Sequence, residues 1–205
     1  MDHVLYINLK KRVDRKHFME SQFGRMDVVL ERVEAIECSN GALGCALSHV
    51  KCLELAKQRR LPYVCICEDD IFFLNPQKTM ESAKALVHVQ WDVLLLGANI
   101  VPPYFRFNHL CMKVHNAQTT TGYIVKEAYY DTLLQNIKTG ISALLLSQNP
   151  KRFAIDIYWK KLQQLDQWVI LIPLAVVQRP DYSDIERRHV NYTKPMLSDK
   201  RHLLF

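Results

Sequence analysis

Residues 64–73 read VCICEDDIFF, in which an apolar segment runs into three consecutive carboxylates and apolar residues then resume. The apolar part predicts a buried strand with Glu68, Asp69 and Asp70 at its carboxyl end. Crowded carboxylates that lose hydration repel one another, so a cation is needed beside them. If the strand continued, Glu68 and Asp70 would point to one face and Asp69 to the other. Such oxygen ligands suit Mn²⁺ or Mg²⁺, while a solvated acidic turn is the alternative interpretation.

The rest of the chain alternates predicted strands with predicted helices. Strands are predicted at 3–9, 28–35, 91–97, 110–114, 119–125, 169–172 and 174–177, and helices at 18–24, 44–58, 79–88, 129–140 and 157–165. This alternation indicates an α/β fold with a mainly parallel, Rossmann-like sheet flanked by helices. Sites in such folds lie at the carboxyl ends of the strands. We expect residues 1–178 to form this domain and the basic tail 179–205 to pack on or near the site, or to be partly disordered.

The balance of charge favours anionic partners. The chain has 205 residues, 49% of them hydrophobic, and a net charge of +6, which suits one substantial core and a basic surface. Basic residues gather at 10–16 and 179–201, and aromatic residues do not interleave with the first cluster. This arrangement favours a local phosphate site over a nucleic-acid track, and it leaves peripheral contact with an acidic membrane surface open.

The six cysteines contain no CxxC pair, and two of them alternate on the predicted acidic strand. They are typical of reduced, mostly buried thiols in an intracellular protein. No signal-like segment precedes the first strand, and no apolar run is long enough to span a membrane. We therefore expect a soluble, cytoplasmic protein.

A basic loop follows the first predicted strand. Asn8 ends this strand, and Arg12 and Arg15 follow near the start of a helix. The positive end of a helix dipole combined with guanidinium groups is a favourable place for a diphosphate. An ordinary solvated basic turn is the alternative.

The predicted helix 44–58 carries further polar candidates. Gly44 suggests a close approach of the backbone, and Ser48 and His49 could face a site. Cys45, His49 and Cys52 share one helical face, so a zinc site with Cys38 has to be considered. Three ligands on one straight helix do not converge easily on a tetrahedral ion, which argues against zinc on the spacing alone.

Four blocks of sequence, taken in order, resemble glycosyltransferase family 25. They are residues 6–9 with Arg12 and Arg15, residues 44–49 (GCALSH), residues 68–70 (EDD), and Gln178 with residues 183–185. The acidic block is also similar to the D-x-D signature of metal-dependent glycosyltransferases. The family includes bacterial lipopolysaccharide-core galactosyltransferases, procollagen galactosyltransferases and relatives in large DNA viruses. One departure is Ala42, where relatives often have an acidic residue.

The resemblance implies a single GT-A-type domain, a UDP-galactose or UDP-glucose donor, Mn²⁺ (or Mg²⁺) dependence and inversion at the anomeric carbon. The acceptor would be a hydroxyl of a glycan or a protein. Asp70 and Glu68 would bind the metal, and Gln178 and Asp184 from the tail would complete the metal or phosphate shell. The nucleotide-sugar would be held by Asn8, Arg12, Arg15, Gly44, Ser48, His49 and Asp69.

The resemblance also points to Asp156 as the catalytic base. An inverting transfer needs a base on the face opposite the leaving diphosphate, away from the metal carboxylates. Asp156 stands at a predicted helix start, where the dipole should lower its pKa, and a helix N-cap is the alternative role.

Two other classes of function are alternatives to a glycosyltransferase. A metal-dependent nuclease or phosphoesterase would also use clustered carboxylates, but it needs further acidic ligands on separate elements. A catalytically inactive carbohydrate-binding module could keep the same fold. Metal-dependent hydrolysis of UDP-sugars would separate the transferase from both.

Overall fold

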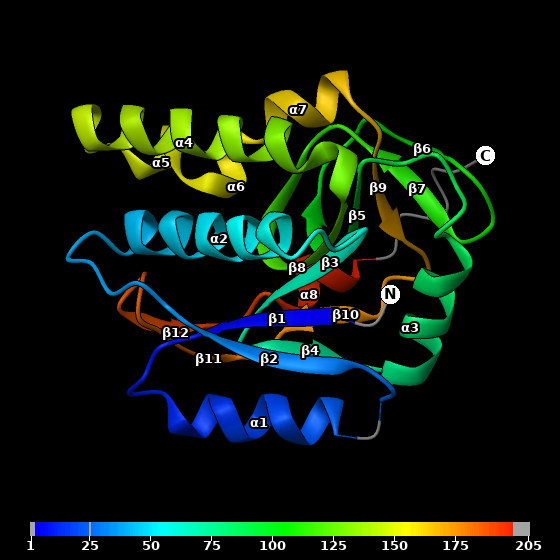
Figure 1. The fold of residues 1–205 in the computed structure, drawn as a ribbon, viewed down its shortest axis with the longest axis horizontal. Coiled ribbons are helices and arrows are strands. Elements are labelled where there is room, and N and C mark those ends of the chain that lie inside the picture. The colour runs from blue at the N-terminus through cyan, green and yellow to red at the C-terminus, as the bar shows by residue number, and fades with distance from the viewer. Residues whose placement is uncertain (1–2, 25, 199–205) are drawn as a thin grey trace.

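The computed structural model describes residues 3–24 and 26–198, and its centre is an eight-stranded sheet (Figure 1). The strand order is β2-β1-β3-β8-β5-β9-β7-β6. The strands are β1 (His3–Asn8), β2 (Val29–Glu34), β3 (Tyr63–Glu68), β5 (Val93–Ile100), β6 (Tyr104–Arg106), β7 (Cys111–Val114), β8 (Ala117–Lys126) and β9 (Trp168–Leu171).

Most of these strands run in one direction. β1 pairs in parallel with β2 and β3, and β5 pairs in parallel with β9. β8 lies antiparallel between β3 and β5, and β7 lies antiparallel between β9 and β6. Only β7 and β8 therefore oppose the other six, which agrees with the predicted mainly parallel sheet.

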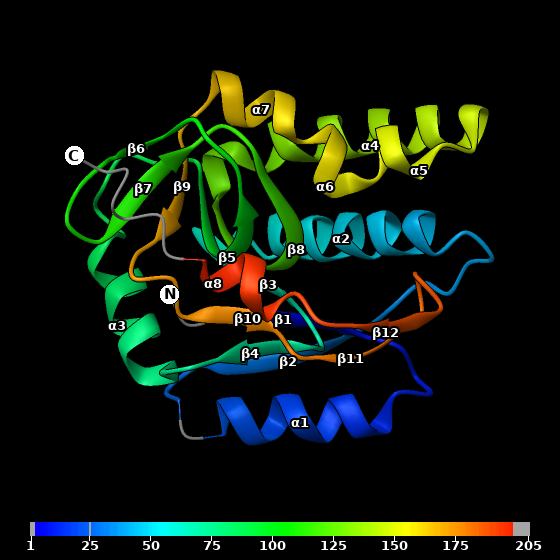
Figure 2. The ribbon, with the colours of Figure 1, turned by 180° about the vertical axis from the view of Figure 1, so that it is seen from behind.

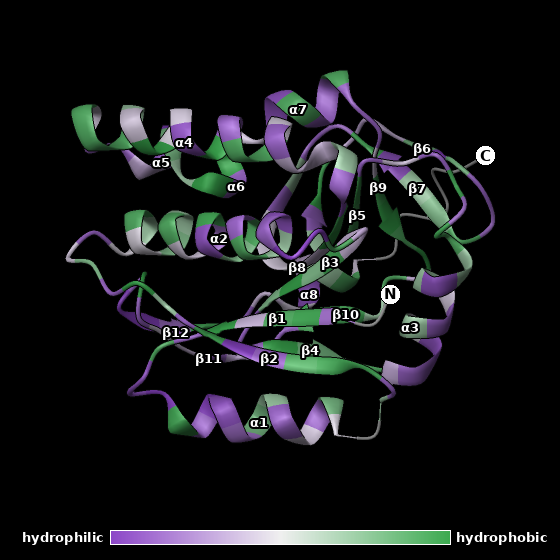
Figure 3. Cartoon of the chain, in the orientation of Figure 1, coloured by the Kyte–Doolittle hydropathy of each residue, from purple (hydrophilic) through white to green (hydrophobic). Residues whose placement is uncertain are grey.

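Helices cover both faces of the sheet. In Figure 1, α2 (Gly41–Gln58) and α4 (Tyr130–Ser147) lie in two tiers on one side of the strands, and α1 (Val13–Phe23) lies on the other. α3 (Pro76–Ala85) stands at one end of the sheet. Because each face is covered, the central strands consist largely of apolar residues, and Figure 3 shows β1 mostly in the green of hydrophobic residues.

Side-chain alternation along the strands produces two separate cores. Leu5 and Ile66 belong to the core under α2 and α4. Tyr6 and Cys67, each one residue further along, belong to the core under α1 and α3. The same period of two places consecutive residues at the ends of β1 and β3 on opposite faces.

Gly44 has a structural reason within the chain. A Cβ at this position would lie 2.4 Å from the carbonyl oxygen of Ile36, in the loop after β2. Glycine therefore lets α2 begin directly against this loop. Ser48 fixes the same contact, because its hydroxyl donates to the Gly44 carbonyl (2.7 Å) and accepts from the Ile36 N–H (2.8 Å).

The helical region after β8 differs from the prediction. α4 continues through Gly140 to Ser147, so the segment 141–149 is mostly helical. Gly140 does not end the helix; it makes room for the ring of Tyr158, which a Cβ would approach to 3.0 Å. The predicted helix 157–165 is interrupted: α6 (Ile155–Tyr158) and α7 (Lys160–Leu165) replace it, and α5 (Pro150–Phe153) precedes them.

The end of the chain forms small elements beside the main sheet (Figure 2). β4 (Ile71–Phe73) pairs antiparallel with β10 (Val176–Gln178), and β11 (Asp181–Ser183) pairs with β12 (Arg188–Val190). α8 (Thr193–Leu197) follows, and the last seven residues of the predicted tail, 199–205, lie outside the described residues. Among the described residues, no helix combines the length and the apolar character needed to cross a bilayer.

Candidate functional site

A cavity of about 690 Å³ opens at the carboxyl ends of β1, β2 and β3. Of the residues predicted for the site, the following line it: Arg12, Arg15, Gly44, Ser48, His49, Glu68, Asp69, Asp70, Gln178 and Asp184. The two others, Asn8 and Asp156, are not among the lining residues. Residues from both ends of the chain thus meet at one edge of the sheet.

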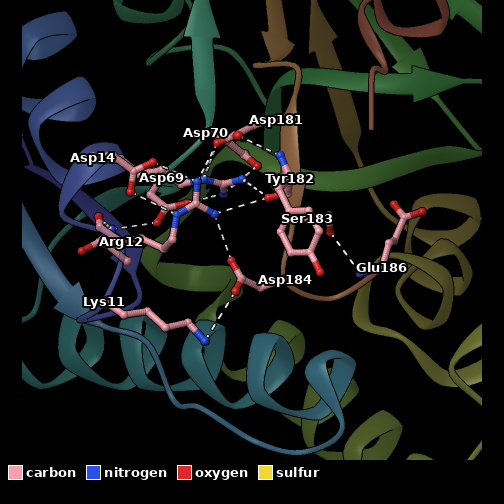
Figure 4. A network of polar contacts seen from close by, with 12 residues as sticks. Lys11, Arg12, Asp14, Asp69, Asp70, Asp181, Tyr182, Ser183, Asp184 and Glu186 are labelled. Carbon is pink, nitrogen blue, oxygen red and sulfur yellow. Dashed lines mark hydrogen bonds and ion pairs between the residues drawn. The ribbon is translucent and has the colours of Figure 1, made fainter. Parts of the chain in front are cut away.

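Arg15 joins the carboxylates after β3 to the carboxy-terminal segment, and Figure 4 shows its partners Asp69, Asp70 and Asp181. One guanidinium nitrogen, Nη1, donates to Asp69 Oδ1 (2.7 Å) and to Asp70 Oδ2 (3.0 Å). Nε donates to Asp181 (3.2 Å), and Nη2 donates to the Tyr182 carbonyl (3.0 Å). Arg15 is only 8% exposed, so it is the buried cation that neutralises the carboxylates after β3.

Arg12 ties the carboxy-terminal segment to the same network. Its guanidinium pairs with Asp181 (2.6 Å) and Asp184 (3.0 Å), and it also pairs with the exposed Asp14 (3.0 Å). Lys11 reaches Asp184 as well (3.4 Å). The tail therefore closes one side of the cavity through ion pairs with the loop after β1.

Asn8 acts from behind the cavity wall. Its Nδ2 donates to Asp69 Oδ2 (2.8 Å) and to the Arg12 carbonyl (3.0 Å), and its Oδ1 accepts from Arg32 Nε (2.7 Å). These three bonds leave the buried side chain well partnered. Asn8 therefore orients Asp69 and the basic loop.

Asp70 is the most perturbed carboxyl group of the cluster. Burial, followed by the negative charges of Glu68 and Asp69, raises its pKa to about 7 despite Arg15 and a hydrogen bond from Gln178 (2.9 Å). Its second oxygen, Oδ1, is buried and accepts no hydrogen bond within the part of the chain that the structure describes. A bound divalent cation would provide a partner for an unpaired carboxylate oxygen beside two other carboxylates, so the residues fit Mn²⁺ or Mg²⁺.

Arg15→Ala should lower the free energy of unfolding by about 3–5 kcal/mol, because it leaves two buried carboxylates without their cation. Arg59→Ala is a matched control: Arg59 pairs with Glu31 on the surface (2.5 Å), where loss of a pair costs about 1 kcal/mol or less. Urea unfolding of both variants gives the comparison. Equal losses would mean that Arg15 is not the counterion of the cluster.

Glu68 faces a different set of partners from Asp70. Its Oε1 accepts from Thr120 Oγ1 (2.6 Å) and Cys45 Sγ (3.6 Å), and it lies 3.7 Å from His49 Nε2. Burial acts to raise the pKa of Glu68, but the contacts with His49, Thr120 and Cys45 outweigh it, so the pKa is lowered. Glu68 is therefore held as a carboxylate.

Asp156 is the second residue of α6, whose N-cap is Ala154. The N–H of Thr119 donates to the carboxylate. Thr119 has a φ of 99°, which is strained for a β-branched residue. The expectation of a lowered pKa is wrong: burial, with the charge of Glu68 adding to it, raises the pKa of Asp156. A four-residue helix has too little dipole to compensate for that burial.

Thr120 and Tyr123, for which no site role was predicted, position Glu68 and His49. Tyr123 Oη lies 3.0 Å from His49 Nδ1, and both side chains are buried. The run 119–122 (TTTG) was a usable signal, because polar residues on a strand that pairs with β3 must lie beside its acidic end.

Comparison with known proteins identifies relatives of this chain. Residues 37–158 match the family model described as "Glycosyltransferase family 25 (LPS biosynthesis protein)". A Haemophilus influenzae protein described as "Putative glycosyltransferase" is 34% identical over 86 residues, which are 40% of this chain and 28% of that protein. The matched stretch therefore spans less than a third of that relative.

Solved structures also resemble this chain. The crystal structure of "A197 from STIV" has a TM-score of 0.51 and 12% identity, and the match covers 93% of each chain. A glycosyltransferase involved in the glycosylation of the major capsid of PBCV-1 has a TM-score of 0.45 and 8% identity, with 83% of this chain and 94% of that chain covered. The mixed α/β architecture of GT-A type is confirmed, and the family model covers more than half of the sequence. The chain belongs to glycosyltransferase family 25.

Proposed function

We propose that this chain is a metal-dependent, inverting hexosyltransferase that moves galactose or glucose from a UDP-sugar to a hydroxyl group of a glycan or protein. The observation that carries the proposal is the buried, unpartnered Oδ1 of Asp70 at the wall of the cavity. Asp70 and Glu68, completed by Gln178 and Asp184, would hold Mn²⁺ or Mg²⁺, which when bound neutralises the diphosphate leaving group.

The basic loop after β1 would receive the diphosphate. Arg12 and Arg15 are paired with carboxylates of the tail, and guanidinium groups exchange such partners for phosphate oxygens with little change of geometry. Ser48 and Gly44 keep the loop after β2 against α2, so their part in the donor pocket is to shape its wall.

Asp156 would take the proton of the acceptor hydroxyl. A raised pKa makes a carboxylate a stronger base, and the Thr119 N–H fixes its orientation. Asp156 comes from α6, whereas the carboxylates of the cation site follow β3.

The test is release of UDP from UDP-galactose and UDP-glucose by the purified chain, with Mn²⁺ or with EDTA. We expect release with Mn²⁺ only, and a rise in melting temperature with the preferred donor by mass action. Neither release nor stabilisation with either donor would contradict the proposal. Cleavage of nucleic acid with Mn²⁺ would favour a nuclease instead.

Arg12→Ala should weaken the binding of UDP by roughly tenfold while leaving the binding of uridine nearly unchanged, since a guanidinium group pairs with phosphate oxygens and offers the base little. Isothermal titration with both ligands measures the difference. Arg59→Ala, on the surface away from the cavity, is the control. Equal losses for UDP and uridine would mean that Arg12 only holds the tail in place.

A further inference from the structure

Three side chains with metal-binding atoms meet at the inner wall of the cavity. Cys45 and His49 lie one turn apart on α2, and Glu68 ends β3. The ligand atoms of all three lie within 4.8 Å of one another. Cys38 and Cys52, which the sequence offered as further ligands, are not part of this group.

Two of the three separations match a tetrahedral zinc site. Bond lengths to zinc of about 2.0–2.3 Å place a thiolate sulfur and a carboxylate oxygen about 3.6 Å apart, and an imidazole nitrogen and that oxygen about 3.4 Å apart. The observed distances to Glu68 Oε1 are 3.6 Å from Cys45 Sγ and 3.7 Å from His49 Nε2. The third separation, between Cys45 Sγ and the His49 nitrogen, is within 4.8 Å, so small side-chain shifts would bring all three ligands to one ion.

His49 is prepared as a ligand. The side chain is fully buried, and Tyr123 Oη holds its Nδ1 at 3.0 Å. Nε2, aimed at Glu68 and Cys45, has no hydrogen-bond partner among the described residues. A hydrogen bond to one ring nitrogen that leaves the other free for a metal is the usual arrangement of ligating histidines.

We propose that Cys45, His49 and Glu68 form a binding site for a thiolate-preferring divalent cation, with zinc as the best fit, which shares Glu68 with the proposed Mn²⁺ or Mg²⁺ site of sugar transfer. Thiolate and imidazole ligands suit zinc, whereas Mn²⁺ and Mg²⁺ prefer oxygen. All three residues line the cavity, which gives the ion an access route. The contacts of Glu68 in this cluster use Oε1, and none of them involves Oε2.

The spacing of residues along α2 argued against zinc because it considered ligands from one helix only. Cys52 packs in the core under α2, and the third ligand comes from β3 instead. A strand that ends beside a helix can supply a ligand from a direction that no residue of the same straight helix offers.

Cobalt(II) is the probe, because a thiolate ligand on cobalt gives a near-ultraviolet charge-transfer band. We expect the purified full chain to bind about one Co²⁺ with this band, and zinc to displace it. Cys45→Ser should abolish the band, whereas Cys38→Ser, which alters another cysteine lining the cavity, should keep it. Absence of the band in the unmodified chain, or its persistence in Cys45→Ser, would overturn the site.

Two further variants keep the test independent of folding and of sugar transfer. Glu68→Gln retains the thiol and should weaken Co²⁺ binding by about tenfold or more, since loss of a ligand costs at least as much as loss of a residue that hydrogen-bonds to a ligand. Asp70→Asn should keep the band, because Asp70 is not in the cluster. Unchanged affinity in a folded Glu68→Gln protein, or loss of the band in Asp70→Asn, would contradict the assignment whatever the outcome for transfer.

Discussion

Asp70→Asn should lower metal-dependent sugar transfer by roughly 10²- to 10³-fold or more, because stabilisation of a leaving diphosphate by a cation is worth several kcal/mol. The substitution removes a charge and preserves volume. It should not lower the melting temperature, since the carboxylate it replaces is buried beside two others and has an unpartnered oxygen. Transfer rates with saturating Mn²⁺ and thermal unfolding give the two readouts.

Asp14→Asn is the matched control for that experiment. Asp14 also pairs with an arginine of the basic loop, but its side chain is 59% exposed and does not line the cavity. We expect the Asp14→Asn protein to transfer at nearly the normal rate. Full activity of Asp70→Asn would remove Asp70 from the cation site.

Asp156→Asn should lower transfer to acceptor by about 10²- to 10⁴-fold, as expected for the loss of a general base. Donor affinity, metal affinity and melting temperature should stay close to normal, because the Asn side-chain oxygen can still accept from the Thr119 N–H. Single-turnover transfer, measured beside binding of UDP, separates the catalytic step from donor binding.

Asp131→Asn controls for a carboxylate in the first turn of a helix. Asp131 occupies that position in α4, and its side chain is 75% exposed. The Asp131→Asn substitution should leave the rate of sugar transfer unchanged. If a stable Asp156→Asn protein transfers normally, Asp156 only supports the strained turn at Thr119, and the search for the base moves to Asp181 and Asp184.

Hydrophobic patterning was enough to predict most elements of the fold. Strands buried on both faces carry uninterrupted apolar runs, such as those of β3 and β5, and breaks in the runs mark their ends. The pattern misjudged Gly140, because a glycine that admits the ring of Tyr158 looks in sequence like a helix terminator.

For the site as well, local sequence predicted some features and missed others. The position of Asp70 and its neighbours at the end of a buried strand follows from local sequence, and so does the basic loop after Asn8. Their partners do not: Arg15 pairs with Asp181, which is 166 residues away in the sequence. The sign of the pKa shift of Asp156 likewise depends on burial by other elements.

Local sequence determines which residues are buried and which charged residues come directly after a strand, since periodicity and turn chemistry act over a few residues. Which elements become neighbours is decided only when the chain packs. β8 enters antiparallel between β3 and β5, which brings Thr120 to Glu68, and α2 settles over β3, which brings Cys45 and His49 to the same carboxylate. These contacts join distant segments, and their geometry depends on register and helix placement, which a one-dimensional pattern does not encode.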